Sequence, residues 1–396
     1  MKYDNFLGGI FMNIGINASF LRKPYTGIGQ VTTHVLNEIA QRSQTDKSMK
    51  NHKFFIYCED ECDIELPKNF YRRSFLPRFY KRDDLFRKLL WEKMWLPRRA
   101  HKDKCDILIS LYQSTTVIKY TDMQHIMLVH DVIPHIFPEY LGNWRKKLYW
   151  EQTEKGMYSS NKIITVSQHT KIDLESKLNI KAAKISVDTI AVDPIFQKEI
   201  SDLEESKVLQ KYNLTKGYIY TGGGLEMRKD ADRTLRAYKL LREKWSDAPD
   251  LVVSGKLMPE LSPMVVDVER IVRELGIEDY VRVLGFVPQE DLPALYRGAK
   301  LFVFPSRYEG FGMPVLEAMS VGTPVITARN SSLEEVGGDV VAYVEHEDEL
   351  ICDKMMELLQ DEELLQKMSI QGKERSGQFT WDKFITDLCD MTCERK

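Results

Sequence analysis

One stretch, residues 305–319 with the sequence PSRYEGFGMPVLEAM, constrains the fold of this chain more than any other. It follows the apolar run of residues 300–304, which predicts a buried parallel strand. Gly310 and Gly312 permit a tight loop with close approach of the backbone, and Pro314 lies where a helix takes its first residue. A strand, a glycine loop and a helix N-terminus in this order direct free N–H groups at an anion, so the stretch predicts an anion-binding site.

Two carboxylates flank this predicted site, Glu309 in the loop and Glu317 about one turn into the helix. Carboxylates that face a phosphate repel it, which favours contacts from both acids to hydroxyl groups of the same ligand. Phosphates and hydroxyls together are typical of a sugar nucleotide. The stretch therefore predicts a site for that class of ligand.

The composition bounds the class of protein. A chain of 396 residues is long enough for two domains with full cores. With 43% hydrophobic residues, 29% charged residues and a formal net charge of -3, it is typical of a soluble globular protein and not of a general nucleic-acid binder. No apolar run approaches the ~20 residues that span a bilayer, and residues 1–11 lack the features of a signal peptide. We expect a cytoplasmic protein whose first strand begins near Met12, with residues 1–11 as an extension.

The six cysteines are scattered along the chain and form no convincing zinc or redox motif. Cys58 and Cys62 are four residues apart, as are Cys389 and Cys393, but no histidine cluster accompanies either pair. Free thiols in a reducing compartment are the favoured interpretation.

The first half of the chain reads as alternating strands and helices. Residues 26–29, Thr-Gly-Ile-Gly, follow a strand at 14–18 and precede a helical pattern through Val31, Val35 and Ile39. This second glycine turn before a helix also suits phosphate, although it lacks the third glycine of a dinucleotide fingerprint. Further strands are predicted at residues 54–57, 106–110, 125–129, 162–166 and 185–190.

A polar pair, His130 and Asp131, follows the strand at 125–129. Ligands of α/β sheets bind at the carboxyl ends of parallel strands, which favours a functional role for His130. The alternative, a core histidine with satisfied hydrogen bonds, stays open from the residues alone.

Residues 71–104 are basic and aromatic, with an amphipathic helical pattern around Leu85, Leu89 and Trp95. One interpretation is a solvated helix that packs its aromatic side chains inward. The other is a face that contacts an anionic membrane surface or an anionic acceptor.

A polar, acidic stretch at residues 198–207 predicts the boundary to a second domain. The segments after it repeat the strand–helix plan and end in two helices within residues 362–393, the second starting at 379–382. Ser332 and Glu335 have the spacing of a capping box. Strands are predicted at residues 218–220, 251–256, 281–287 and 324–327, and a short helix at 289–296.

A glycine run and two adjacent cations follow the first strand of this second series. Residues 222–224 are glycines, and Arg228 and Lys229 come shortly after them. They do not form a P-loop, because no Gly-Lys-Ser/Thr sequence follows. Asp230 and Asp232 resemble a metal-binding pair, but capping of a helix beside the two cations explains them more simply.

Four of these features together resemble glycosyltransferase family 4, whose members are retaining enzymes of the GT-B fold. Glu309 and Glu317 reproduce its E-x7-E signature, and residues 222–229 resemble its G-G-x-x-P-R-K motif, with Met227 where proline is usual. Residues 26–29 resemble its T-G-I-G loop, and residues 130–134 resemble the H-D-x-x-P segment of its bacterial mannosyltransferase-like branch. The motifs occur in the family's order and span most of the chain.

The resemblance implies an α/β chain of GT-B architecture, with two Rossmann-like domains facing across a cleft. Residues 12–197 would form the acceptor domain, and residues 206–378 would form the nucleotide-sugar donor domain. A C-terminal helix, residues 379–396, would cross back onto the first domain.

The resemblance also implies roles for the candidate residues. Arg228 and Lys229 would bind the donor diphosphate and neutralise the charge that develops as it leaves. Glu309 would accept from hydroxyls of the donor sugar, Glu317 would accept from the ribose, and His130 would approach the sugar near its reacting carbon. The other donor-binding positions would supply mainly backbone contacts: Gly27, Gly29, Gly224, Phe286, Val287, Gly310, Phe311, Gly312, Met313, Pro314 and Val315.

The expected reaction is retaining transfer of mannose from GDP-mannose to a hydroxyl of a glycan or lipid-linked acceptor. Front-face substitution is favoured, because no carboxylate is dedicated to a covalent intermediate. No metal or other cofactor is expected, since Arg228, Lys229 and helix dipoles serve the leaving group. A UDP-glucose, UDP-N-acetylglucosamine or deoxysugar donor stays open, as do a phosphorylase or epimerase of this fold and a non-catalytic subunit. Contact with the inner membrane face through residues 71–104 is a further expectation, and nucleic acid is not an expected partner.

Overall fold

The computed structural model describes residues 11–46, 49–60, 64–74 and 83–393. The chain divides into two compact units, one formed by Met1–Ile190 with Trp381–Lys396 and the other by Ala191–Thr380. Residues 191–197, which the sequence assigned to the first domain, lie in the second unit, where Phe196 packs against Tyr296 with ring centroids 5.9 Å apart. Residues 1–10, Cys62 and residues 75–82 of the basic segment lie outside the described residues.

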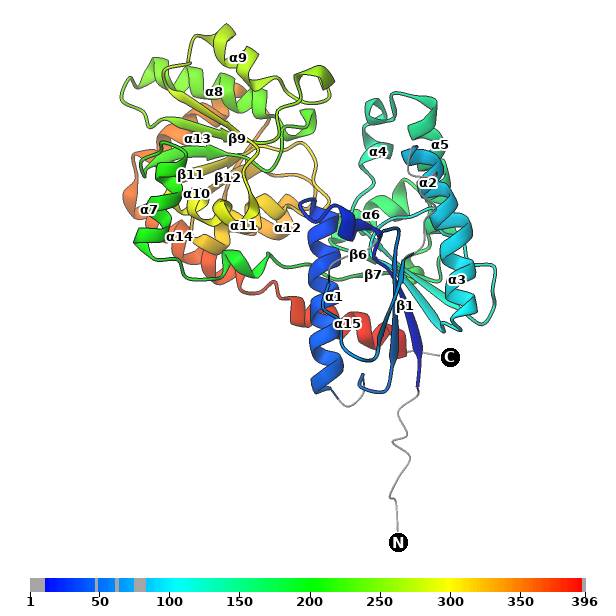
Figure 1. Cartoon of the computed structure of the whole chain (residues 1–396). Coiled ribbons are helices and arrows are strands. Elements are labelled where there is room, and N and C mark those ends of the chain that lie inside the picture. Colours follow the sequence, from blue (N-terminus) through cyan, green and yellow to red (C-terminus); the bar gives the residue numbers. More distant parts are fainter. Residues whose placement is uncertain (1–10, 47–48, 61–63, 75–82, 394–396) are drawn as a thin grey trace. The chain divides into compact units, whose positions relative to one another are not determined.

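The first unit is built on a seven-stranded sheet whose neighbouring strands are all parallel (Figure 1). Its central strands are almost wholly buried, as expected for strands with helices on both faces. The strands, in their order across the sheet, are β3 (Phe70–Ser74), β2 (Lys53–Cys58), β1 (Asn13–Asn17), β4 (Ile107–Ser110), β5 (Gln124–Val129), β6 (Lys162–Thr165) and β7 (Ile185–Val187).

Helix α1 (Gly27–Thr45) begins where the sequence predicts, because the Thr26 side chain accepts a hydrogen bond from the Gly29 amide at 3.2 Å. The last helix, α15 (Trp381–Cys393), packs against α1 within the same unit. Its Trp381 ring stacks on His34, with centroids 5.1 Å apart. The other helices of this unit include α2 (Asp84–Leu90), the π-helical turn η3 (Trp91–Trp95), α3 (Leu96–Lys102), α4 (Ile133–Ile136), α5 (Trp144–Ser159) and α6 (Gln168–Ser176).

The second unit has a six-stranded sheet, again with every neighbouring pair parallel. Across the sheet the strands are β10 (Val281–Gly285), β9 (Leu251–Ser254), β8 (Tyr218–Thr221), β11 (Ala299–Phe304), β12 (Val325–Ala328) and β13 (Ala342–Val344). Its helices include α7 (Asp202–Lys211), α8 (Ala231–Lys244), α9 (Val268–Leu275), α10 (Leu292–Gly298), α11 (Met313–Val321), α12 (Leu333–Gly337), α13 (Asp348–Leu359) and α14 (Glu362–Ser376).

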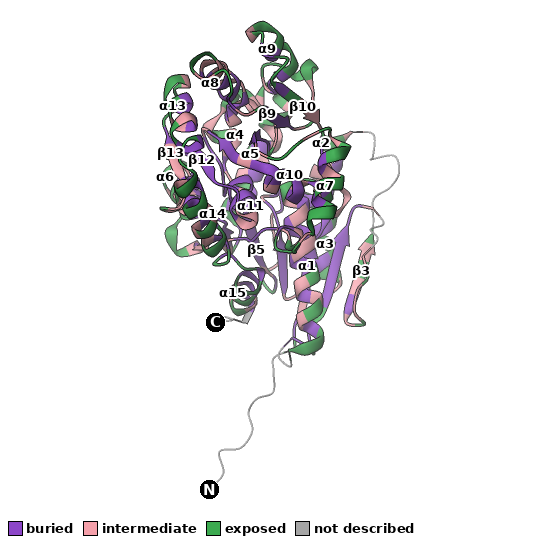
Figure 2. Cartoon of the chain, turned by 90° about the vertical axis from the view of Figure 1, so that its left-hand side faces the viewer, coloured by how far each residue is buried: buried purple, intermediate pink, exposed green. Residues whose placement is uncertain are grey.

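Burial follows the layers expected for an α/β chain. Figure 2 shows buried strands beneath helices such as α7 and α9 whose outward faces are exposed. In the second unit the core joins β8, β9 and β11 to α8 and α13 through residues such as Leu235, Val253 and Leu301, each fully buried. No helix in the described parts of the chain combines the length and apolar character needed to cross a bilayer.

Several elements were not predicted from the sequence, among them the helices α5 and α13. The acidic stretch that suggested a domain boundary is largely helix α7, which starts with a capping box between Ser201 and Glu204. Strand β3 lies at the sheet edge with an alternating, partly exposed pattern, and β13 has only three residues. All the strands and helices that the sequence predicted are present, with ends shifted by a few residues.

Candidate functional site

The loops after β8 and β11 meet in the second unit, at the carboxyl ends of two neighbouring parallel strands. The glycine run after β8 packs on the start of α11, because a Cβ at Gly223 would lie 2.5 Å from Cγ of Pro314. Gly223 also has φ +85°, a conformation that other residues rarely adopt. Only glycine therefore lets the two loops approach this closely.

Helix α11 starts with an N-terminus free of side-chain capping. Gly312, with φ +108°, occupies the capping position without a side chain, and Pro314 is the second helical residue instead of the first. The amides of Val315 and Leu316 both donate to the Gly312 carbonyl, at 3.0 and 3.2 Å. The helix N-terminus that the sequence predicts is therefore present, with its positive dipole end beside the glycine run.

Arg228 and Glu309 form a buried ion pair in the loops after β8 and β11. The Arg228 Nη1 atom donates to Glu309 Oε1 and to the Tyr308 carbonyl, each at 2.6 Å, and both residues are 8% exposed. Ser306 Oγ donates to the same Glu309 oxygen at 3.0 Å. The two residues that the sequence singled out separately are thus direct partners, each compensating the charge of the other.

Lys229 turns toward the glycine run. Its ammonium donates to the Gly223 carbonyl and lies 3.5 Å from a carboxylate oxygen of Glu226. Burial acts to raise the pKa of Glu226, but Lys229 and Arg228 outweigh it and hold that pKa below its usual value. Two cations and the Glu226 carboxylate are therefore concentrated at this turn, with Glu309 of the loop after β11 paired to one of the cations.

Glu317 is buried on α11, where Tyr296 Oη donates to its Oε2 atom at 3.0 Å. Burial raises the pKa of Glu317 to about 7, with Asp193 adding to the rise and Tyr296 and Lys229 acting against it. A carboxyl group with this pKa titrates near neutrality and accepts hydrogen bonds best when ionised.

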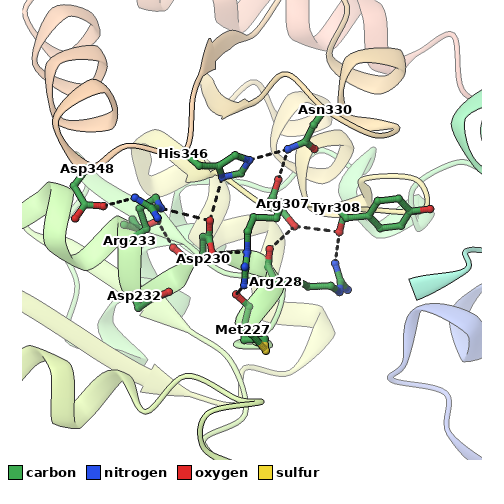
Figure 3. A network of polar contacts seen from close by, with 12 residues as sticks. Met227, Arg228, Asp230, Asp232, Arg233, Arg307, Tyr308, Asn330, His346 and Asp348 are labelled. Carbon is green, nitrogen blue, oxygen red and sulfur yellow. Dashed lines mark hydrogen bonds and ion pairs between the residues drawn. The ribbon is translucent and has the colours of Figure 1, made fainter. Parts of the chain in front are cut away.

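The aspartates that the sequence assigned to helix capping do not cap. Asp230 precedes α8 in the left-handed conformation, and its side chain makes no capping hydrogen bond. Its oxygens instead lie 3.0 Å from Arg307 Nε and 3.1 Å from His346 Nδ1 (Figure 3). Asp232 pairs with Arg236 one turn along α8. The charged partners around Asp230 override the local capping preference.

The predicted capping box at Ser332 and Glu335 is also wrong. Ser332 does lie at the capping position of α12, but its hydroxyl donates to the Glu309 carbonyl at 2.8 Å. The neighbouring Ser331 accepts from the Glu309 amide at 3.0 Å. Both serines therefore fix the backbone of Glu309.

Other predicted donor positions surround these loops. Gly224 has φ +111°, and a Cβ there would lie 3.2 Å from Lys229 Nζ. Phe311 is buried and packs edge-to-face on Phe379, with centroids 5.8 Å apart. Phe286 and Val287 follow the end of β10, and Phe286 is 58% exposed.

The remaining candidates lie in the first unit. Gly27 opens α1 with free space around it, whereas a Cβ at Gly29 would lie 2.0 Å from the Lys23 carbonyl. The preceding loop therefore requires glycine at position 29. His130 directly follows β5 and is buried, with Nε2 2.9 Å from the Leu111 carbonyl. Burial lowers the pKa of His130, which favours the neutral imidazole. The contact with the Leu111 carbonyl satisfies its Nε2 atom.

The basic segment is partly internal. Trp91 is buried, and Arg87 is buried in an ion pair with Glu59 at 2.6 Å. Phe86 and Trp95 are 55% and 37% exposed. Within the described residues, the inward packing is therefore present for some side chains, while contact of the exposed ones with an anionic surface stays a prediction.

Sequence reasoning missed Tyr296, Ser306, Asn330 and His346, all of which contact a candidate residue or its loop. Asn330 and His346 follow the ends of β12 and β13, and that position was a signal that could have found them. No group of three or more His, Cys, Asp or Glu side chains in the described ranges is arranged to hold a metal ion.

Comparisons with known proteins cover both units. Residues 27–194 match the family model Glycosyltransferase Family 4, and residues 204–375 match Glycosyl transferases group 1. The O-antigen chain mannosyltransferase B of Escherichia coli is 34% identical over 259 residues, 65% of this chain and 67% of that protein. The serotype-specific mannosyltransferase WbdA of Escherichia coli is 28% identical over 65% of this chain, which spans only 32% of its length. The crystal structure of WaaG, a glycosyltransferase involved in lipopolysaccharide biosynthesis, matches with a TM-score of 0.71 at 15% identity, over 96% of this chain and 99% of its own.

Proposed function

The chain belongs to glycosyltransferase family 4 and has the expected GT-B fold, and from this premise we propose that it is a retaining mannosyltransferase using GDP-mannose. The observation that supports this most is the joint placement of Arg228, Lys229 and the N-terminus of α11 beside the glycine run, with Glu309 and Glu317 next to them. Mannose is proposed because curated relatives over 65% of this chain are mannosyltransferases.

Two side-chain cations are proposed to stabilise the leaving group of the reaction. When the sugar–phosphate bond breaks, negative charge develops on the departing diphosphate, and Lys229 and Arg228 are proposed to stabilise it. Arg228 is proposed to act on the phosphate while its Nη1 atom stays bonded to Glu309. The dipole of α11 adds to the same electrostatic stabilisation.

The acids and the exposed aromatic are proposed to recognise the donor. Glu309, held by Arg228 and Ser306, accepts from hydroxyls of the sugar, and Glu317 accepts from those of the ribose. Phe286 and Val287 lie after β10 and are proposed to contact the base. Gly29 and His130 are proposed to serve diphosphate and sugar as the family resemblance implies.

Retention is proposed to follow front-face substitution, in which the departing phosphate oxygen takes the proton of the acceptor hydroxyl. Glu309 is engaged by Arg228, which argues against its use as a covalent nucleophile. We propose that no metal ion is needed, because two side-chain cations already serve the leaving group. Full activity in EDTA is expected, and loss of turnover that magnesium restores would contradict this part.

The central test compares donors and a matched pair of lysine variants. We expect product formation and nucleoside diphosphate release with GDP-mannose, and neither with UDP-glucose, UDP-N-acetylglucosamine or dTDP sugars. Lys229→Met is expected to lower kcat about 10²- to 10³-fold. Lys239→Met, which removes a partly exposed lysine of α8 paired with Glu243, is expected to leave kcat unchanged.

The outcomes separate the alternatives. Turnover with another donor would overturn the assignment of mannose as the donor sugar and would support the transferase activity. Release of sugar phosphate on addition of inorganic phosphate would indicate a phosphorylase. Binding of the donor without any turnover would indicate a non-catalytic subunit.

The acceptor is proposed to be a glycan or lipid-linked glycan at the inner membrane face. Exposed Phe86 and Trp95, with exposed basic residues such as Arg98 nearby on α3, suit an anionic surface. We expect flotation with anionic vesicles at low salt, none with neutral vesicles, and weaker flotation of Trp95→Ser. Absence of flotation at low salt would count against membrane contact.

A further inference from the structure

A ring of polar contacts joins the loops that follow four neighbouring strands of the second sheet, β8, β11, β12 and β13 (Figure 3). Asp230 Oδ2 lies 3.1 Å from His346 Nδ1, and His346 Nε2 lies 2.9 Å from Asn330 Nδ2. The Asn330 amide also donates to the Ser306 carbonyl at 3.1 Å. Arg307, next to Ser306 in the chain, closes the ring through its Nε atom, 3.0 Å from Asp230 Oδ1.

The hydrogen-bond partners of His346 assign its tautomer. Because the Asn330 amide nitrogen can only donate, His346 Nε2 accepts from it. The proton of a neutral imidazole then lies on Nδ1, which donates to Asp230. His346 therefore links a neutral amide on one side to a buried carboxylate on the other.

The ring is attached directly to the candidate catalytic pair. The Arg307 amide donates to the Arg228 carbonyl at 2.8 Å, and its guanidinium donates to the Met227 carbonyl at 2.8 Å. Ser306 Oγ donates to Glu309 Oε1 at 3.0 Å. Any shift of residues 306–307 therefore moves both the Arg228 backbone and the Glu309 carboxylate.

Asp230 is the residue on which these contacts converge. It is 5% exposed and has φ +53°, a left-handed conformation that costs a non-glycine residue about 1 kcal/mol or more. Its partners Arg307 and His346 come from different strand ends, and Arg233 of α8 lies 3.6 Å away. A strained backbone held by several long-range partners is typical of a residue that orients a functional site.

We propose that Asp230 and His346 are positioning residues, and that the ring sets the geometry of the Arg228–Glu309 pair for transfer. His346 follows β13, three strands away from β8 in the sheet, so its effect on Arg228 passes through Asp230 and through Asn330. This inference rests on the proposed function for its main readout, because it concerns the rate of sugar transfer.

The test compares Asp230→Asn, His346→Ala and His346→Asn, with Asp232→Asn as the matched control. Asn at position 230 keeps the size of the side chain and tolerates the left-handed backbone, so it removes the charge with little change of fold. A misplacement on the order of 1 Å costs about 100-fold in rate, and we expect kcat to fall about 10- to 100-fold in Asp230→Asn and His346→Ala. Affinity for the nucleotide sugar, measured by calorimetry, is expected to change about threefold or less, since Lys229 and α11 are untouched.

His346→Asn is expected to recover part of this loss, because its amide donates to Asp230 from nearly the position of Nδ1. Asp232→Asn removes an acid two residues away that pairs with Arg236 one turn along α8, and its kcat is expected to match the wild type. Wild-type kcat in Asp230→Asn and His346→Ala would overturn the proposal. So would a loss of kcat in proportion to a loss of folded protein, with no recovery in His346→Asn.

Hydrogen exchange gives a second readout that needs no turnover. Peptides covering residues 305–309 are expected to exchange faster in His346→Ala than in the wild type or in Asp232→Asn, because the loop loses the Asn330–His346 support. Unchanged exchange in these peptides would also overturn the proposal. If the wild type is inactive with every donor, but His346→Ala still exchanges faster than the wild type and Asp232→Asn, the proposed function is refuted. The role of the ring in holding residues 305–309 is then retained.

Discussion

Replacement of Glu317 by glutamine changes the pH dependence of stability by an amount that follows from the surroundings of the carboxyl group. Its pKa is about 7 in the folded protein against an ordinary value of 4.5, chiefly because of burial. The folded state therefore binds the proton more tightly than the unfolded state. Stability of the wild type falls as pH rises from about 4.5 to about 7, because the unfolded chain releases this proton first.

The size of the effect follows from proton linkage. Between pH 5 and pH 8 these two pKa values remove about 2.5 kcal/mol of folding stability from the wild type. Glutamine does not titrate and can still accept from Tyr296, so Glu317→Gln escapes this loss. The second unit contains residues 191–380, for which 1 kcal/mol shifts Tm by about 2–4 °C. The Tm of Glu317→Gln relative to wild type is thus expected to rise by about 5–10 °C between pH 5 and pH 8.

Differential scanning calorimetry at both pH values measures this difference. All other titrating groups are common to the two proteins, so they cancel when the Tm difference at pH 5 is subtracted from that at pH 8. Glu260→Gln, at an exposed position of the same unit, is the control and is expected to show no such change. A Tm difference for Glu317→Gln that is the same at both pH values would refute the raised pKa.

Three further predictions address other parts of the structure. Gly223→Ala combines a positive φ with a collision against Pro314, and it is expected to destabilise the second unit by about 2 kcal/mol or more and to weaken nucleotide binding. Its control, Gly217→Ala, has φ +102° but open space and is expected to cost about 1 kcal/mol. Equal thermal shifts of the two variants would contradict the collision. Burial and the neighbouring Asp387 raise the pKa of Asp188 to about 7, so the wild type loses stability as pH rises toward 7. Asp188→Asn is therefore expected to gain about 2–3 kcal/mol over the wild type between pH 5 and pH 8, measured by denaturant titration. Trp381→Ala removes a buried ring stacked on His34 and is expected to lower the folding stability of the first unit by about 3–5 kcal/mol. Asp382→Ala removes an exposed ion-pair partner and is expected to lower that stability by less than about 1 kcal/mol. Similar melting temperatures of the two variants would show that α15 is not held by its aromatic contact.

Local patterns in the sequence were sufficient for much of the fold. Strands such as β5 and β11 are continuous apolar runs, and α1 starts at a threonine followed by helical spacing, so each element is specified by its own residues. The edge strand β3, with the sequence FYRRS, was missed because only Phe70 in it is buried and its charges resemble a loop.

The contacts of the site could be predicted only in part. The glycines and charges of residues 222–229 and 305–317 stand out in the sequence, but the pairing of Arg228 with Glu309 joins residues 81 positions apart. Asp230 and Ser332 occupy capping positions, yet long-range partners take their side chains. Local propensity ranks the choices of such residues, and tertiary contacts decide between them.

The packing of α15 on α1 has a consequence for synthesis of the protein. The first unit is discontinuous in sequence, because it needs residues 381–393 to complete the surface around His34 and Arg42. On the ribosome, the continuous unit of residues 191–380 emerges in full before those residues do. The contacts between α1 and α15 can therefore form only after the whole second unit has been synthesised.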